Sequence, residues 1–162
     1  MTVGKMKYFN KSNCIVHVWY DEAIYTCDEI ANAGVFDPSS ASFTALHRIA
    51  ALCNNAVFDA DAENMNKEVA IRKTVGDASE SALLKFCEPI SNVEQFRSRY
   101  PKVFEIPFNS VNKWQLSIHL TPDQESMLLL KGAPERVIDR CSKILIDGEV
   151  KMKFPRNLRV GT

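Results

Sequence analysis

Three short segments place polar or charged side chains where an apolar element begins or ends. They are Gly-Asp-Ala-Ser-Glu-Ser at 76–81, Ile-Pro-Phe-Asn-Ser-Val-Asn-Lys at 106–113 and Lys-Gly-Ala-Pro-Glu-Arg at 131–136. A folded scaffold commonly presents its binding residues at such positions. Carboxylates, lysines and one aromatic ring are therefore the groups with which this chain could bind a ligand.

The usual glycine loops for binding phosphate are missing from the sequence. The six glycines form neither a G-x-G-x-x-G nor a G-x-x-x-x-G-K-[ST] motif. The histidines His17, His47 and His119 never pair at ligand spacing, so we expect no metal site and place each histidine on the surface or on an exposed helix side. A nucleotide would have to be held by other means.

Each candidate residue also has a purely structural interpretation. Asp77 and Glu80 have the spacing of a capping box, in which both satisfy free amides at a helix start. Phe108 at a strand end is more often a core residue, and Lys131-Gly132 could be a turn before a helix that begins at Pro134. Spacing and periodicity alone leave the function open.

Composition limits the class of protein. A chain of 162 residues is one domain's worth, and 46% hydrophobic with 25% charged residues is typical of a globular protein. Twenty basic and twenty acidic residues cancel, which argues against nucleic acid or an anionic membrane as partners. No apolar run reaches the roughly 18–20 residues that cross a bilayer. The five scattered cysteines suggest reduced thiols, three of them on buried helix faces.

The pattern of apolar residues predicts a mixture of strands and helices. Residues 14–20 and 24–27 read as a hairpin, 42–54 as a helix with one apolar stripe, and 59–73 as an exposed loop. A helix opens near Gly76 and stops at Pro89, and a shorter one covers 93–100.

Strands dominate the second half of the chain. Residues 103–108, 114–119 and 127–130 read as strands, the last as a central one because it is continuously apolar. Strand 114–119 alternates, so we expect its apolar side chains, Leu116 among them, to face inward. A helix follows at Pro134, and Asp147-Gly148 predicts a two-residue hairpin. Together these favour an α+β fold with a largely antiparallel sheet flanked by helices.

Taken in order, the polar segments resemble the nucleotide-binding domain of P-type ATPases, most closely the sodium/potassium and gastric proton/potassium pumps. The resemblance covers about residues 16–150. It is carried by Gly-Asp-Ala-Ser-Glu-Ser-Ala-Leu-Leu-Lys at 76–85, Glu-Ile-Pro-Phe-Asn-Ser-Val-Asn-Lys-Trp-Gln-Leu-Ser-Ile-His at 105–119 and Lys-Gly-Ala-Pro-Glu-Arg-Val at 131–137, with Leu-Cys-Asn at 52–54.

The resemblance implies a pocket for the adenine of ATP without a phosphate loop. Phe108 would stack on the ring, Glu80 would accept from the exocyclic amine, and Gly132 would let the purine approach the backbone. The other residues implied at the site are Asp77, Ser79, Lys113, Gln115 and Lys131. In such a pump the ligand is Mg-ATP, the partners are the phosphorylation and actuator domains, and the location is the cytosolic face of the plasma membrane.

The catalytic motifs of the family are missing. The phosphorylated aspartate motif Asp-Lys-Thr-Gly-Thr does not occur in the sequence, so we expect no catalytic residue and no ATP hydrolysis by this chain alone. The Thr-Gly-Glu-Ser motif and the membrane helices are absent as well. The role of a phosphate-side arginine is not transferred to Arg159, because the helix expected before it is missing.

We expect an N-terminal segment with an insertion at 1–15, an ATP-binding domain at 16–153 that lacks its C-terminal sheet edge, and an irregular tail at 154–162. The first functional hypothesis is an ATP-binding domain that presents ATP to an aspartate on another domain. The alternative is a truncated, non-enzymatic interaction module with little or no nucleotide binding.

Overall fold

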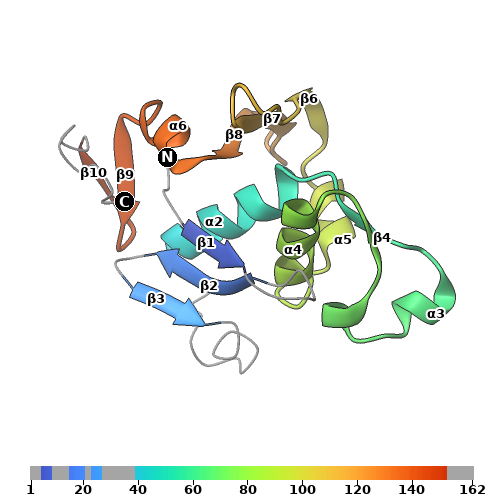
Figure 1. Cartoon of the computed structure of the whole chain (residues 1–162). Coiled ribbons are helices and arrows are strands. Elements are labelled where there is room, and N and C mark those ends of the chain that lie inside the picture. Colours follow the sequence, from blue (N-terminus) through green and yellow to red (C-terminus); the bar gives the residue numbers. More distant parts are fainter. Residues whose placement is uncertain (1–4, 9–14, 21–22, 27–38, 153–162) are drawn as a thin grey trace.

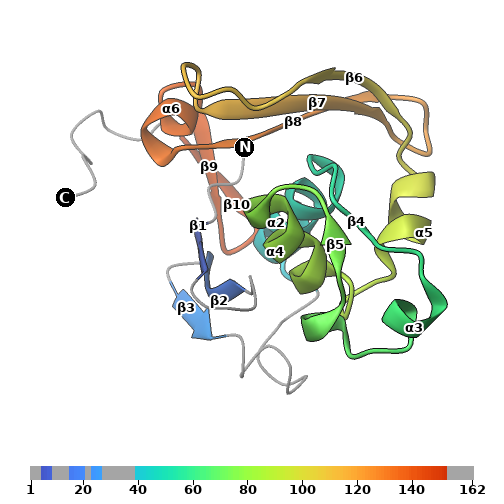
Figure 2. The same cartoon turned by 45° about the vertical axis from the view of Figure 1, so that its right-hand side comes forward.

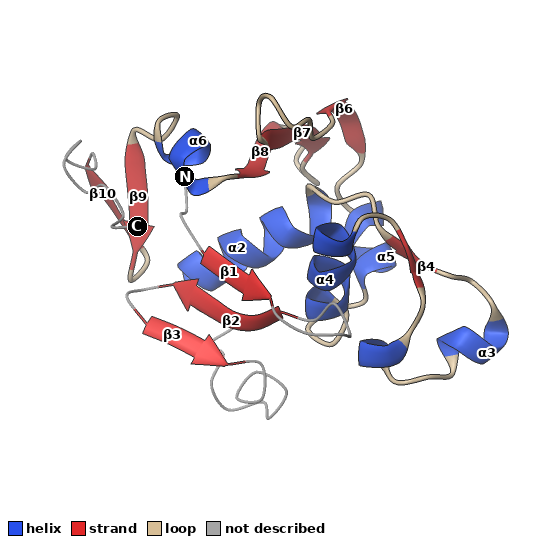
Figure 3. Ribbon diagram, viewed as in Figure 1, coloured by secondary structure: helices blue, strands red, loops and turns tan. Residues whose placement is uncertain are grey.

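Antiparallel sheets and short helices follow one another along this chain without a regular alternation (Figure 1). The computed structural model describes residues 5–8, 15–20, 23–26 and 39–152. The predicted tail at 154–162, Arg159 and most of the loop expected at 32–42 lie outside these residues. The described elements confirm the α+β class (Figure 3).

A layer of helices under a three-stranded sheet forms the centre of the described structure (Figure 2). The sheet order is β6–β7–β8, with both pairs antiparallel. The helices are α2 (Ala41–Leu52), α4 (Ala78–Cys87) and α5 (Val93–Ser98), and the strands are β6 (Lys102–Ile106), β7 (Trp114–Leu120) and β8 (Ser126–Gly132).

Helix α2 confirms the helix predicted at 42–54. Ser40 caps its start, because the Ser40 hydroxyl accepts from the Phe43 amide at 3.2 Å. Phe43, Leu46 and Ala50 form the buried stripe. It packs against the buried side chains of α4, namely Ala82, Leu84, Phe86 and Cys87.

The remaining elements are short. The hairpins predicted at 14–27 and at Asp147-Gly148 are confirmed, the second with φ of 51° and 74° at its two turn residues.

The short elements outside the central layers are β1 (Lys5–Tyr8), β2 (Ile15–Tyr20), β3 (Ala23–Thr26), β4 (Val57–Phe58), α3 (Ala62–Met65), η1 (Val69–Ile71), β5 (Thr74–Val75), α6 (Pro134–Ile138), β9 (Lys143–Ile146) and β10 (Glu149–Met152).

The predicted orientation of β7 is wrong. Its buried side chains are the polar ones, Gln115, Ser117 and His119, and they face the helix layer, whereas Leu116 and Ile118 are only half-buried on the outer face. The polar face is acceptable inside because its groups are hydrogen-bonded to one another and to the backbone. His119 illustrates this: its Nδ1 donates to the Tyr100 carbonyl at 2.9 Å, so its Nε2 accepts from the Ser117 hydroxyl at 2.9 Å.

The outer face of the sheet is apolar. Ile118 lies between Phe104 on β6 and Leu128 on β8 in the strand register, and these two are 51% and 57% exposed. The central strand is thus β7 and not the predicted 127–130 segment, because in the described part of the chain β8 pairs with β7 alone.

Two further expectations need correction. The segment 59–73 is not a plain exposed loop: it contains α3 and η1, and the buried amide of Asn64 bonds the Asp59 and Lys73 carbonyls at 2.9 and 3.1 Å. His47 and His119 are not surface residues either, because both are buried. The ring of His47 packs against Phe43 and Phe96, which is a contact that apolar patterning does not reveal.

Burial of these histidines predicts a loss of stability in mild acid. Desolvation lowers the pKa of His47 and of His119 from their ordinary value of 6.5, so the folded state favours the neutral rings. Their contribution is fully present above about pH 6.5 and is lost as the pH falls towards the lower folded pKa. Urea melts should therefore show a lower free energy of unfolding at pH 5.5 than at pH 7.5.

The variant His47→Gln should reduce this pH dependence, because glutamine does not titrate. An identical decline between pH 7.5 and 5.5 in His47→Gln and in the unchanged chain would contradict a role for His47.

Candidate functional site

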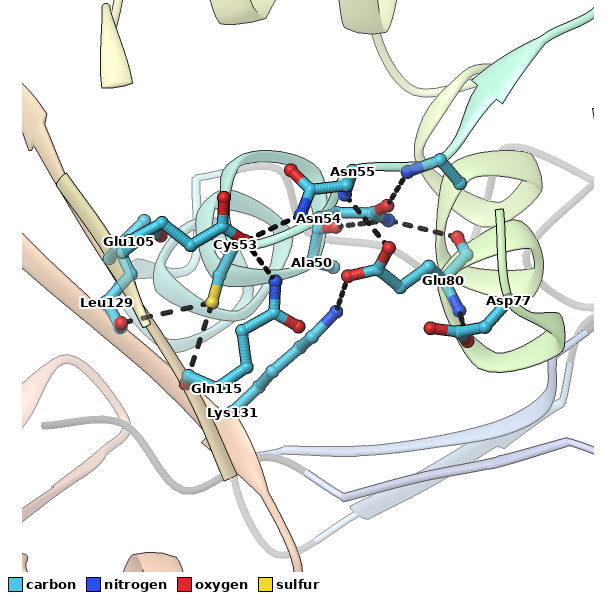
Figure 4. Close-up of polar contacts among 12 residues, drawn as sticks. Ala50, Cys53, Asn54, Asn55, Asp77, Glu80, Glu105, Gln115, Leu129 and Lys131 are labelled. Atoms are coloured by element: carbon cyan, nitrogen blue, oxygen red, sulfur yellow. Dashed lines mark hydrogen bonds and ion pairs between the residues drawn. The ribbon is translucent and has the colours of Figure 1, made fainter. Parts of the chain in front are cut away.

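A network of polar side chains joins the helix layer to the inner face of the sheet (Figure 4). At its centre the Glu80 carboxylate accepts from Lys131 Nζ at 2.8 Å and from the Asn55 backbone N–H at 3.1 Å. Glu80 comes from α4, Lys131 from β8, and Asn55 from the turn after α2. Three segments distant in sequence therefore meet at one carboxylate.

The start of α4 directs Glu80 towards the sheet. Asp77 is the N-cap, and its Oδ1 accepts from the Glu80 backbone N–H at 2.9 Å. Only this half of the predicted capping box forms between Asp77 and Glu80, because the Glu80 side chain points to Lys131 and Asn55 instead. The structural interpretation therefore holds for Asp77, while the Glu80 carboxylate cross-links three elements.

A second carboxylate, Glu105 on β6, continues the network. Its Oε1 accepts from Asn55 Nδ2 at 2.6 Å and from Gln115 Nε2 at 2.8 Å, and its Oε2 pairs with Lys102 Nζ at 3.1 Å. Partial burial alone would raise the pKa of Glu105. The hydrogen bonds from Asn55, Lys102 and Gln115 outweigh that effect and hold the pKa below its ordinary value, so Glu105 stays ionised.

The loop between β6 and β7 presents the aromatic candidate. Phe108 is 57% exposed, so its interpretation as a core residue is wrong. The Asn109 side chain orders the loop by accepting from the Val111 and Asn112 amides at 3.1 and 2.7 Å. Lys113 ends the loop in the left-handed region, with φ of 59°.

This loop is held against the end of β8. The Ala133 amide donates to the Lys113 carbonyl at 2.9 Å, and Trp114 pairs with Gly132 in the strand register. A Cβ at Gly132 would lie 2.4 Å from the Lys113 carbonyl oxygen and 2.6 Å from the Trp114 Cα. Glycine is therefore required here by the close approach of two backbone segments, independently of any role in binding a ligand.

Comparison with known proteins places this chain in a family. Residues 42–157 match the family model described as P-type ATPase, cytoplasmic domain N. This chain belongs to that family.

Among its relatives, the human sodium/potassium-transporting ATPase subunit alpha-2 is 52% identical over 140 residues, which cover 83% of this chain and 14% of the relative. The alpha-2 subunit of Bos taurus has the same identity and coverage. The sodium/potassium-transporting ATPase subunit alpha of Tetronarce californica is 51% identical over 142 residues, 85% of this chain and 14% of the relative. The chain thus spans about one seventh of the length of these relatives. Among the described helices, none is long and apolar enough to span a bilayer.

In this N domain, the structure joins Glu80, Gln115 and Lys131 in one network, linked through Asn55 and Glu105. The other residues that the sequence singled out lie around it: Ser79 and Asp77 are exposed at the start of α4, Phe108 and Lys113 are exposed in the β6–β7 loop, and Gly132 ends β8.

Sequence reasoning missed the residues that hold this network together. Asn55 follows α2 and Lys102 begins β6, and the sequence singled out neither; Asn54 and Glu105 stand only within the strings that carry the resemblance. An Asn-Asn pair directly after an amphipathic helix was the available signal, because amides are well suited to the unpaired carbonyls at a helix end.

The close approach at Gly132 predicts a large effect of adding one methyl group. Gly132→Ala should lower the free energy of unfolding by about 1–3 kcal/mol, because the neighbouring atoms are backbone and cannot move aside easily. The matched control is Gly148→Ala, where the added Cβ meets nothing within 4 Å and only the left-handed φ of 74° is strained. That strain costs about 1–2 kcal/mol.

Urea melts of both variants provide the measurement, and amide spectra show where each change spreads. Gly132→Ala should alter the resonances of Lys113 and Trp114, and Gly148→Ala should not. An alanine at 132 that leaves both stability and these resonances unchanged would rule out the close packing.

Proposed function

We propose that this N domain binds the adenine of ATP and belongs to a sodium/potassium-transporting P-type ATPase. The observation that carries the proposal is the pairing of the Glu80 carboxylate with Lys131 and Asn55 between α4 and the end of β8. Each carboxylate oxygen accepts one of these hydrogen bonds, and a carboxylate oxygen can accept two, so Glu80 could accept a further hydrogen bond from a ring amine.

The position of the loop supports a stacking role for Phe108. The end of β6, the start of β7 and the end of β8 meet at one end of the antiparallel sheet, which brings the Phe108 loop to the same end as Lys131 and Gly132. A base stacked on an exposed aromatic ring gains roughly 1–3 kcal/mol. A carboxylate acceptor adds selectivity for a purine that carries an amine.

The remaining residues complete the proposed site. Lys113 and Lys131 line the pocket, Gln115 and Ser79 stand nearby, Asp77 caps α4, and Gly132 keeps the backbone accessible to the purine. Without a phosphate-binding loop, a Kd on the order of 0.1–10 mM for ATP is expected. The ligand in the whole pump would be Mg-ATP.

The parent pump supplies the chemistry that this chain lacks. ATP held here would be presented to an aspartate on a phosphorylation domain, and the actuator domain would be the other partner. Such a pump would place this domain at the cytosolic face of the plasma membrane.

The stacking role is tested with two exposed phenylalanines, Phe108 in the β6–β7 loop and Phe104 on β6. Phe108→Ala should weaken ATP binding by about 1–3 kcal/mol while leaving stability nearly unchanged, because the ring is already 57% exposed. Phe104→Ala is the matched control, since Phe104 is 51% exposed on the outer face, and it should bind ATP normally. ATP titrations followed by amide spectra measure both.

If Phe108→Ala binds ATP as tightly as the unchanged chain, Phe108 is not the adenine platform. If ATP leaves the spectrum of the unchanged chain unperturbed up to about 30 mM, beyond the expected Kd range, the non-binding alternative is correct.

The absence of the Asp-Lys-Thr-Gly-Thr motif from the sequence predicts that ATP is bound without reaction. With γ-labelled ATP, the purified chain should form no acyl-phosphate that survives acid and should release no phosphate above the buffer control. Label that survives acid and is released by hydroxylamine would show an acceptor carboxylate that the family comparison does not reveal.

A further inference from the structure

Asn54 is a buried polar residue at which every amide atom has a partner. It is only 2% exposed; its Nδ2 donates to the Ala50 and Glu80 carbonyls at 3.1 and 3.0 Å, and its Oδ1 accepts from the Ala56 amide at 2.8 Å. A buried amide that spans two helices in this way fixes their separation, because losing a partner leaves a desolvated polar group.

The location of Asn54 explains which parts it connects. Helix α2 ends at Leu52, and the Asn54 side chain satisfies the Ala50 carbonyl in its last turn. The same amide group reaches the carbonyl of Glu80 in the first turn of α4. Asn54 therefore ties the end of one helix to the start of the other, at the residue that carries the proposed adenine acceptor (Figure 4).

The next residue, Asn55, contacts the side-chain carboxylate of Glu80. The Asn55 backbone N–H donates to Glu80 Oε2 at 3.1 Å, while Lys131 binds Oε1 at 2.8 Å. The Asn54-Asn55 dipeptide thus bonds Glu80 at its main-chain carbonyl and at its carboxylate. Two contacts from one turn fix both the position of Glu80 and the direction of its carboxylate, and neither contact does so alone.

We propose that Asn54 is a positioning residue that makes this site select 6-aminopurine over 6-oxopurine nucleotides. The inference rests on the proposed binding of adenine. A ring amine donates to the Glu80 carboxylate, whereas the oxygen of a 6-oxopurine would face it acceptor to acceptor. Rejection of the second ligand requires that Glu80 cannot swing aside, since a mobile carboxylate would turn away and reduce the penalty.

The experiment compares ATP with inosine triphosphate, which carries an oxygen in place of the amine, on the whole chain. The measured quantity is the ratio of the two Kd values. A hydrogen bond to a charged group predicts a preference for ATP of about tenfold to a hundredfold in the unchanged chain. Glu80→Gln should remove most of this preference and so calibrates the assay.

Asn54→Asp is the decisive variant, because it keeps the size and the acceptor oxygen but replaces the donor to the Ala50 and Glu80 carbonyls. The preference should fall to less than about threefold, while ATP and inosine triphosphate still compete for one site. Asn64→Asp is the matched control, because Asn64 is also a buried amide whose Nδ2 donates to two backbone carbonyls, and it lies outside the proposed site. It makes the same chemical change away from Glu80, so the preference should stay near the unchanged value.

A merely structural role for Asn54 would weaken both nucleotides equally and leave the ratio intact, and that result would overturn the inference. Equal loss of preference in Asn54→Asp and Asn64→Asp would overturn it too. If Asn54→Asp does not fold, the side-chain amide resonance of Asn54 in the unchanged chain decides: it should shift with ATP and not with inosine triphosphate. An Asn54 resonance that responds alike to both nucleotides would contradict the inference.

If the unchanged chain binds neither nucleotide, the proposed function fails, and the inference about Asn54 fails with it. If the unchanged chain binds ATP but Asn54→Asp keeps the full preference, only the inference fails.

Discussion

The ion pair between Glu80 and Lys131 is the contact on which the arrangement of this domain depends. It is largely shielded from water, and it bridges α4 and β8, which belong to different layers. Removing one partner of a buried pair costs about 3–5 kcal/mol, because the other charge is left uncompensated. The pair therefore sets the distance between helices and sheet near the end of the strands, and the Asn54-Asn55 turn closes the same junction from α2.

This junction also explains why the inner face of β7 is polar. An ion pair at the layer boundary needs hydrogen-bonding neighbours. Asn55 links Glu80 to Glu105, and Gln115 joins the network by donating to Glu105. Further along the strand, Ser117 and His119 continue the polar row and satisfy each other. The larger apolar core lies between α2 and α4, and a smaller apolar cluster of Leu52, Cys53 and Leu129 joins the end of α2 to β8. Both polar and apolar contacts therefore hold the sheet against the helices.

Most of the helices and strands could be predicted from the sequence, but which of their side chains are buried could not. Helix α2 and the turn at Asp147-Gly148 follow from apolar spacing and turn chemistry, which are local signals. Alternation in β7 shows that its two faces differ, yet it does not say which face is inside, and the usual assumption misplaced Leu116. Burial of His47 depends on packing against Phe96, which no local pattern encodes. The contact of Glu80 with Lys131 joins residues 51 positions apart, and only the family resemblance assigned both to one site.

The apolar outer face of the β6–β7–β8 sheet and the polar inner face of β7 have a thermodynamic consequence. Apolar surface that is newly hydrated on unfolding raises the heat capacity, and polar surface lowers it. In this sheet the outer apolar side chains, such as Phe104 and Leu128, are already half in water, while unfolding newly hydrates the polar Gln115, Ser117 and His119 of β7. Both effects act in the same direction, and Leu129 of β8 is the buried apolar exception. The heat-capacity increment of this region should be smaller than the usual 12–15 cal/mol/K per residue, and the dependence of its stability on temperature should be correspondingly flat.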